Sequence, residues 1–247
     1  MYLRVSLGFI ILLIPTALWN HDIFLFLNTI HYPVLDYIFG VTSGLADYLV
    51  TLLFVFLVML FHLRLGLAAL VTYILAGASN QILKHIFDMP RPPALFENIH
   101  ILGEPLYHLS FPSGHATSSG ALACLALHFW QDKPKQAWAV FILFVFVAYG
   151  RIYGGVHFPI DVLVGFTMGA AIMGWIEHVS KQWNLKIWEQ NEWSWKLPGL
   201  ILVFLATIIG TGHQIQPSTA QPLALVLPIA ALILLMQAWK KRLLRES

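Results

Sequence analysis

Three short segments of the 247-residue chain combine basic, histidine and acidic side chains with proline or glycine. They are Lys84–Pro92, Phe111–His115 and Arg151–Asp161. Basic groups directed at one place repel each other unless an anion joins them, and the peripheral oxygens of a phosphate suit such donors. If the chain brings these segments together, they form a pocket for a phosphate group.

The cations of that pocket are Lys84, Arg91 and Arg151. Ser113 and Gly114 precede an apolar run, so their backbone N–H groups would lie at the start of a helix. Helix N-termini favour anions because of their free N–H groups and the helix dipole, and glycine permits close approach. These five residues are the candidate phosphate-binding groups.

Two histidines and a carboxylate complete the set. Asp161 follows His157 by four residues, and Pro159 between them favours the first turn of a helix. A carboxylate that fixes one ring N–H leaves the other imidazole nitrogen unprotonated, as a nucleophile towards phosphorus requires. His115 then remains for proton transfer to the leaving oxygen and from water. We therefore predict His157, His115 and Asp161 as catalytic residues.

The composition places the chain in a membrane. Only 11% of the residues are charged and 58% are hydrophobic, whereas a soluble domain carries about 25% charged residues. A net charge of +2 without a long basic run argues against binding of nucleic acid. The single cysteine, Cys124, excludes a disulfide framework and a cysteine-based zinc site.

The apolar runs predict the elements that position the polar segments. A bilayer span needs about 20 apolar residues, and we interpret the first run as a retained anchor helix because no clear cleavage site follows it. Residues 21–42 favour an interfacial amphipathic segment. The predicted fold is all-α, a polytopic transmembrane helix bundle with spans at roughly 5–20, 43–62, 66–87, 114–130, 136–152, 160–178, 198–213 and 221–239.

The basic residues divide unevenly between the two sides of such a bundle. With eight spans, 11 of the 14 basic residues lie on the side of the termini. Cytoplasmic loops are enriched in Lys and Arg, so both termini are expected in the cytoplasm and the three exceptions on the exterior or periplasmic side. The 11 are Arg4, Arg64, Lys133, Lys135, Lys181, Lys186, Lys196, Lys240, Lys241, Arg242 and Arg245.

The three segments resemble the pattern of the type 2 phosphatidic acid phosphatase family. That pattern is Lys, six residues, Arg-Pro; then Pro-Ser-Gly-His; then Ser-Arg, five residues, His, three residues, Asp. All three parts are present between Lys84 and Asp161, except that Gly150 replaces the serine before the arginine. The resemblance implies a six-helix phosphatase core over residues 1–178, followed by a cytoplasmic joint and two additional helices over 179–247.

The resemblance also implies a role for each matched residue. His157 would form a phosphohistidine, Asp161 would orient it, and His115 would serve the leaving group. The phosphoryl oxygens would be held by Lys84, Arg91, Ser113, Gly114 and Arg151. No metal and no cofactor are implied, and the expected partners are a lipid phosphate and the bilayer, with the oligomeric state undetermined.

The leading functional hypothesis is an integral-membrane phosphatase that hydrolyses a lipid phosphomonoester or diphosphate. Undecaprenyl diphosphate is the first choice because the site is expected to face outward, ahead of phosphatidylglycerophosphate, phosphatidic acid and lipid A. A lipid phosphotransferase stays open as an alternative. A transporter or flippase is less favoured because transporters place polar sites near the bilayer midplane, whereas the charged residues here lie at helix ends. A vanadium haloperoxidase, whose anion pocket resembles that of this family, is disfavoured because haloperoxidases are soluble.

Overall fold

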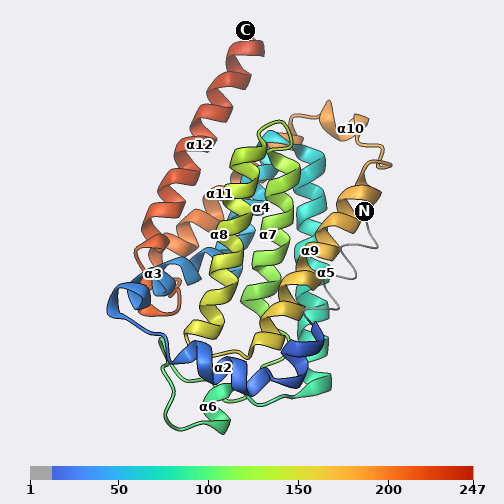
Figure 1. The fold of residues 1–247 in the computed structure, drawn as a ribbon. Helices are drawn as coiled ribbons and strands as arrows, with labels where there is room; N and C mark the ends of the chain where they lie inside the picture. The colour runs from blue at the N-terminus through green and yellow to red at the C-terminus, as the bar shows by residue number, and fades with distance from the viewer. Residues whose placement is uncertain (1–12, 247) are drawn as a thin grey trace.

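A computed structural model describes residues 13–246, with the backbone alone from residue 241. Every regular element in this part of the chain is helical (Figure 1). The elements are α2 (Asn20–Asn28), α3 (Pro33–Ser43), η1 (Gly44–Ala46), α4 (Tyr48–Phe61), α5 (Leu63–Phe87), α6 (Pro92–Leu95), α7 (Gly114–Phe129), α8 (Pro134–Tyr153), α9 (Pro159–Ser180), α10 (Lys186–Glu189), α11 (Trp193–Thr211), η2 (Ser218–Ala220) and α12 (Leu223–Glu246).

The predicted class, an all-α polytopic membrane bundle, is confirmed. Five helices of the described chain are long and apolar enough to cross a bilayer: Leu63–Leu95, Pro134–Tyr153, Pro159–Ser180, Trp193–Thr211 and Ser218–Lys240. Half of the predicted first span, residues 5–12, lies outside the described residues, and residues 13–18 of the other half are helical.

Two predicted spans are shorter than expected. The span predicted over 43–62 is the 14-residue helix α4, because the Asp47 carboxylate caps its start by accepting the N–H of Leu49 at 2.9 Å. The span over 114–130 is the 16-residue helix α7. Helix α7 packs against α5, α8 and α9, so its surroundings are protein more than lipid.

Small residues bring α7 and α9 together. A methyl group on Gly120 would overlap the carbonyl oxygen of Phe166, and one on Gly169 would overlap that of Thr117. Such glycines let helix backbones approach closely in membranes. This packing fixes the start of α7 beside the start of α9, where the predicted catalytic residues lie.

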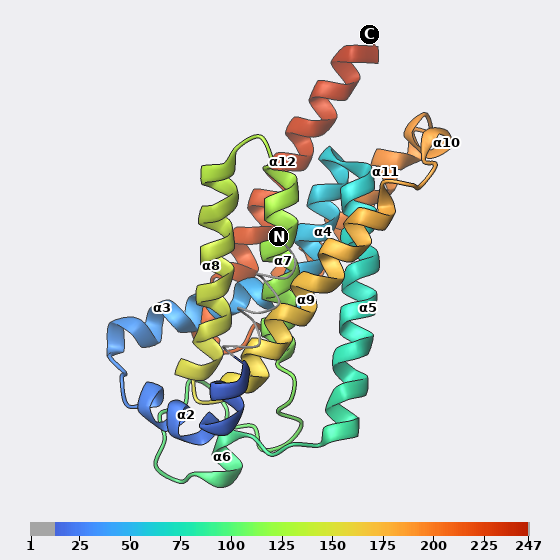
Figure 2. The same cartoon turned by 45° about the vertical axis from the view of Figure 1, so that its right-hand side comes forward.

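The segment predicted to be interfacial, residues 21–42, folds as α2 and α3, whose axes meet at 119°. Figure 2 shows α2 crossing the end of the bundle where α5 and α8 finish. Asn28 donates to the carbonyls of His100 and Tyr153, at 2.9 and 3.2 Å, which ties α2 to the loop after α6 and to the end of α8. The position of this segment at a membrane interface stays a prediction.

The last two long helices contribute to a different buried cluster from the helices that carry the polar segments. Helices α11 and α12 pack against each other and against α4, with Leu202, Leu205 and Ile209 of α11 in a buried cluster with Leu53 and Phe56 of α4. The four elements that carry the polar segments, α5, α7, α8 and α9, are held together by other buried clusters. The C-terminal helices therefore add to one side of the bundle without forming the catalytic end.

Candidate active site

The structure brings the polar segments to one end of the bundle. Lys84 lies in the last turn of α5 and Arg151 in the last turn of α8, whereas His115 and Asp161 lie in the first turns of α7 and α9. The ends of α5 and α8 therefore meet the starts of α7 and α9 (Figure 2). His115 lies within electrostatic range of His157, Arg91, Arg151 and Lys84.

His157 is held between a carboxylate and a guanidinium. Its Nδ1 lies 3.3 Å from Asp161 Oδ2, and its Nε2 lies 3.1 Å from Nη1 of Arg91. Because a guanidinium is always a donor, Nε2 must accept, which assigns the ring proton to Nδ1. The unprotonated nitrogen thus faces the cations, as a nucleophile towards phosphorus requires.

The surroundings of His157 also favour its neutral form. His157 is 2% exposed. Burial and the positive charges of Arg91, Arg151 and Lys84 hold the pKa of its imidazole well below the ordinary value. The imidazole therefore stays neutral as the pH falls through about 6.5, where a free histidine would be protonated.

Asp161 is fully buried and is positioned by its own helix start and by a distant serine. Its Oδ2 accepts the N–H of Phe158 at 2.9 Å, as an acidic residue in a first helical turn commonly does. The same oxygen accepts the hydroxyl of Ser110 at 2.5 Å. Sequence reasoning missed Ser110, which lies two residues before the Pro-Ser-Gly-His segment and is fully buried.

Backbone carbonyls of the loop before α7 hold two of the cations. The carbonyl of Leu109 accepts from Nζ of Lys84 and from Nη2 of Arg91, the latter at 3.3 Å. Leu109 has a φ of 56°, a left-handed conformation that costs a non-glycine residue roughly 1–2 kcal/mol. That conformation directs one carbonyl at both cations and keeps two like charges side by side.

The third cation, Arg151, is positioned by a residue outside the predicted motifs. Its Nη1 donates to the hydroxyl of Ser43 in α3 at 2.8 Å, and its buried Nε has no partner in the described structure. Phe39 lies in α3, like Ser43, and a Cβ on Gly150 would be 2.9 Å from its ring. Helix α3 thus fills the space where the family pattern has a serine and supplies a hydroxyl to the arginine instead.

The expectation for Ser113 needs one correction. Its backbone N–H donates to the carbonyl of Asp161 at 3.0 Å, so it is not directed at an anion. That bond fastens the start of α7 to the start of α9. Ser113 keeps its hydroxyl as the cap of α7, accepting the N–H of Ala116 at 3.4 Å, and the N–H of Gly114 remains the N-terminal group available to a ligand.

A cavity of about 500 Å³ leads away from His115 into the bundle. It lies between α4, α5 and α7, with Gly114, His115 and Asn80 at one end and Leu125 and Met173 at the other. Its lining changes from polar to apolar with distance from the catalytic end. A ligand with a polar head and an apolar tail matches this arrangement.

Comparisons with known proteins agree with the geometry. A 122-residue match with the undecaprenyl-diphosphatase of Sulfolobus acidocaldarius is 30% identical and covers 48% of this chain and 55% of that protein. The chain thus spans about half the length of this curated relative. A match with the lipid A 4'-phosphatase of Porphyromonas gingivalis is 27% identical and covers 62% of this chain and 69% of that protein.

Solved structures show the same arrangement of helices. The crystal structure of Aquifex aeolicus LpxE superposes with a TM-score of 0.60 and 28% identity, covering 66% of this chain and 95% of that one. A PAP2-type phosphatidylglycerolphosphate phosphatase from Bacillus subtilis shares the fold, with a TM-score of 0.58 at 24% identity over 74% of this chain and 98% of that one.

The sequence model of the PAP2 superfamily matches residues 65–185, which contain every catalytic and phosphate-binding residue predicted above. The expected resemblance is therefore confirmed: about half of this multi-pass membrane protein, residues 65–185, matches the PAP2 superfamily.

Proposed function

We propose that this chain is an integral-membrane lipid phosphatase that hydrolyses a lipid phosphomonoester or diphosphate through a phosphohistidine. The observation that carries the proposal is the state of His157, whose unprotonated Nε2 faces Arg91 while Asp161 holds Nδ1. Named phosphatases among the relatives support the same reaction class.

The first step forms the phosphoenzyme. The phosphoryl oxygens of the substrate bind Lys84, Arg91 and Arg151 and displace the contact between Arg91 and Nε2. Nε2 then attacks phosphorus and the bond from phosphorus to the leaving oxygen breaks. His115, which takes up a proton when the negative charge of the bound phosphate offsets the surrounding cations, gives that proton to the leaving oxygen.

The second step regenerates the enzyme. His115, now neutral, takes a proton from a water molecule, and the resulting hydroxide attacks phosphorus. The bond between phosphorus and Nε2 breaks, inorganic phosphate leaves, and both histidines return to their starting states. Throughout, the proton stays on Nδ1 of His157 and is hydrogen-bonded to Asp161. The carboxylate of Asp161 stabilises the positive charge of the phosphohistidine.

Undecaprenyl diphosphate remains our proposed substrate. The Sulfolobus relative is an undecaprenyl-diphosphatase, and the cavity beside His115 becomes apolar along its length. The lipid A and phosphatidylglycerolphosphate phosphatases among the similar proteins make their substrates the alternatives to test.

The deciding experiment measures inorganic phosphate released by the purified full-length chain in detergent from undecaprenyl diphosphate, phosphatidylglycerophosphate, phosphatidic acid and lipid A. We expect release in the presence of EDTA, because three fixed cations supply charge stabilisation that Mg²⁺ provides elsewhere. Transfer of phosphate to a second lipid without release would identify a phosphotransferase. Lipid movement in vesicles without any phosphate chemistry would identify a transporter.

We also propose that the catalytic end faces the exterior or periplasm, with both termini in the cytoplasm of a cell-membrane protein. Support comes from the 11 to 3 division of basic residues. A cysteine in the loop from Glu97 to Glu104 should react with an impermeant thiol reagent on intact cells or spheroplasts, whereas one beside Lys133 should not. The reverse labelling would contradict this orientation.

A last proposal concerns the division of the chain. We infer that residues 1–178 form the phosphatase core and that 179–247 add a cytoplasmic joint and two helices. The superfamily match ends at residue 185, and α11 and α12 pack on α4 instead of on α7 or α9. Deleting 193–247 should reduce stability and leave a measurable phosphatase, whereas complete loss of activity in a folded deletion would contradict the division.

A further inference from the structure

A polar cavity of about 540 Å³ lies at the end of the bundle opposite to the catalytic site. It is bounded by the start of α5, the end of α7 with the turn that follows, and the end of α9. The charged and histidine side chains of its lining are His62, Arg64, His128, Asp132, Lys133, Glu177 and Glu189.

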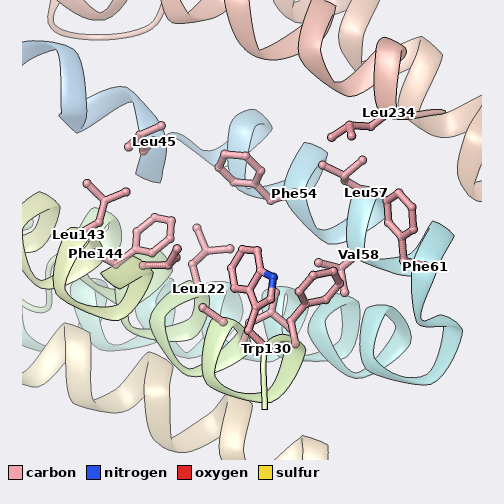
Figure 3. A pocket seen from close by; sticks show the side chains of 14 residues that line it. Leu45, Phe54, Leu57, Val58, Phe61, Leu122, Trp130, Leu143, Phe144 and Leu234 are labelled. Carbon is pink, nitrogen blue, oxygen red and sulfur yellow. The ribbon is translucent and has the colours of Figure 1, made fainter. Parts of the chain in front are cut away.

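An apolar cavity of about 500 Å³ adjoins it between α4, α7, α8 and α12 (Figure 3). Figure 3 shows Phe54 and Leu57 of α4 on the opposite side of the cavity from Leu122 of α7, with Leu234 of α12 next to Leu57. Phe129 and Trp130 line both cavities, so the polar and the apolar cavity meet at these two rings. Tryptophan favours the depth of the lipid headgroups, which sets the level of this junction.

The apolar cavity has the depth of one bilayer leaflet. Along α7 its lining extends from Leu122 to Trp130, a length of about 12 Å at 1.5 Å per residue. Half of a hydrocarbon core of about 30 Å is about 15 Å. Because α7 starts at the catalytic end with Gly114, this leaflet is the one remote from His157.

The charges of the polar cavity are mixed and nearly balanced. Arg64 and Lys133 line this cavity together with Asp132, Glu177 and Glu189, and Nη1 of Arg64 donates to the carbonyls of Ser180 and Lys181 at the end of α9. Lys181 pairs with Glu177 at 3.2 Å and brings the count of cations to three. A headgroup with one positive and one negative charge matches such a surface, whereas a purely anionic headgroup finds no excess of cations there.

We propose that the two cavities form one binding site for a zwitterionic phospholipid with a primary amine, drawn from the leaflet opposite to the catalytic site. The phosphate binds Arg64 and Lys133, the ammonium group donates hydrogen bonds to the carboxylates, and an acyl chain fills the apolar cavity. A choline headgroup lacks N–H donors and fits the carboxylates less well.

The test uses the purified full-length chain in detergent and a phosphatidylethanolamine with a photoreactive diazirine in its acyl chain. We expect cross-links, mapped by peptide mass spectrometry, at residues of α4, α7 and α8 that line the apolar cavity. Unlabelled phosphatidylethanolamine should compete at least fivefold better than phosphatidylglycerol or phosphatidylcholine. Cross-links spread evenly over all lipid-facing helices, or equal competition by the three lipids, would overturn the proposal.

Matched variants separate the tail cavity from the headgroup cavity. Leu143→Trp, or Leu57→Trp as a second filling variant, should lower cross-linking at least fivefold, whereas Leu200→Trp on the exposed face of α11 should leave it unchanged. Glu177→Gln should remove the preference for phosphatidylethanolamine, and Glu97→Gln in the loop at the catalytic end should preserve it. Unchanged labelling in both filling variants would contradict the site.

Folding of each variant is checked by elution volume and thermal unfolding, so a misfolded variant is recognised independently. Cross-linking does not depend on phosphate release. A failure of this proposal therefore leaves the phosphatase assignment intact, and a protein without phosphatase activity can still bind the lipid.

Discussion

The two ends of the helical bundle carry the same kinds of basic side chain in opposite states. At the catalytic end, Lys84 and Arg91 are 8% and 9% exposed. At the other end, the side chains of Lys181 and Lys196 are 61% and 40% exposed. Exposed cations at a helix end extend to the interface at little cost, whereas buried ones lose hydration and need partners.

The partners at the catalytic end differ in kind as well. Lys84 and Arg91 are held mainly by backbone carbonyls of Leu109 and its neighbours, which satisfy N–H groups without neutralising the charge. At the other end, Lys181 and Lys196 each pair with a glutamate four residues earlier. Cations that no carboxylate neutralises are ready to bind an anionic ligand. Cations in exposed ion pairs contribute instead to membrane orientation and to solubility.

The largest expected effect is at the nucleophile. His157→Ala should lower phosphate release by at least about 10⁴-fold, because no phosphohistidine can form without Nε2. His157→Asn tests the same loss with a polar side chain in place. Elution volume and thermal unfolding establish that each variant is folded, and more than a few per cent of residual activity would contradict the assignment.

The next effect is at the proton donor. His115→Ala should lower turnover of lipid substrates by about 10²- to 10⁴-fold. The loss should shrink with a substrate whose leaving group is a good one, such as a nitrophenyl phosphate ester, because that oxygen needs less protonation. An equal loss with every leaving group would argue against the acid role of His115.

A smaller effect is expected at Ser110, which acts through Asp161. Ser110→Ala removes one hydrogen bond to a buried carboxylate, a loss of about 1–3 kcal/mol or roughly 5- to 150-fold in rate. We expect kcat to fall more than KM changes, and Ser110→Thr to restore part of it. Thr207→Ala, which removes an exposed helix hydroxyl, is the control. A change in KM alone would indicate that Ser110 has another role.

The smallest effect is expected at the exposed end. Lys196→Met breaks the pair with Glu192, and an exposed pair contributes about 0–1 kcal/mol. Phosphate release should stay within about twofold and thermal unfolding should shift by a few degrees at most. A loss of activity comparable to that of Lys84→Met would remove the distinction between the two ends.

Much of the catalytic end could be predicted from local spacing. The four-residue interval between His157 and Asp161 allows their side chains to meet where a helix begins at Pro159, and the structure places them 3.3 Å apart. The unequal distribution of basic residues correctly grouped Lys84, Arg91 and Arg151 at one end. Such predictions succeed because they depend on helix periodicity, helix ends and the length of a membrane span, all of which are local.

Other features depended on contacts between distant segments. Ser110 meets Asp161 across 51 residues, and Ser43 meets Arg151 across 108. No local pattern marks either serine. The N–H of Ser113 was predicted to face an anion, yet it bonds to the carbonyl of Asp161, because the close packing of α7 and α9 brings these two helix starts together.

The sequence by itself determined that this protein lies in a bilayer, that its cations divide unevenly between two sides, and which residues are the candidates for phosphatase chemistry, because composition and short-range spacing contain that information. Only the tertiary structure decided which nitrogen of His157 is free, how Leu109 joins two cations, and where cavities open at the two ends. Those properties arise from partners brought together by helix packing, and the identity of such partners is not encoded in any one segment of the chain.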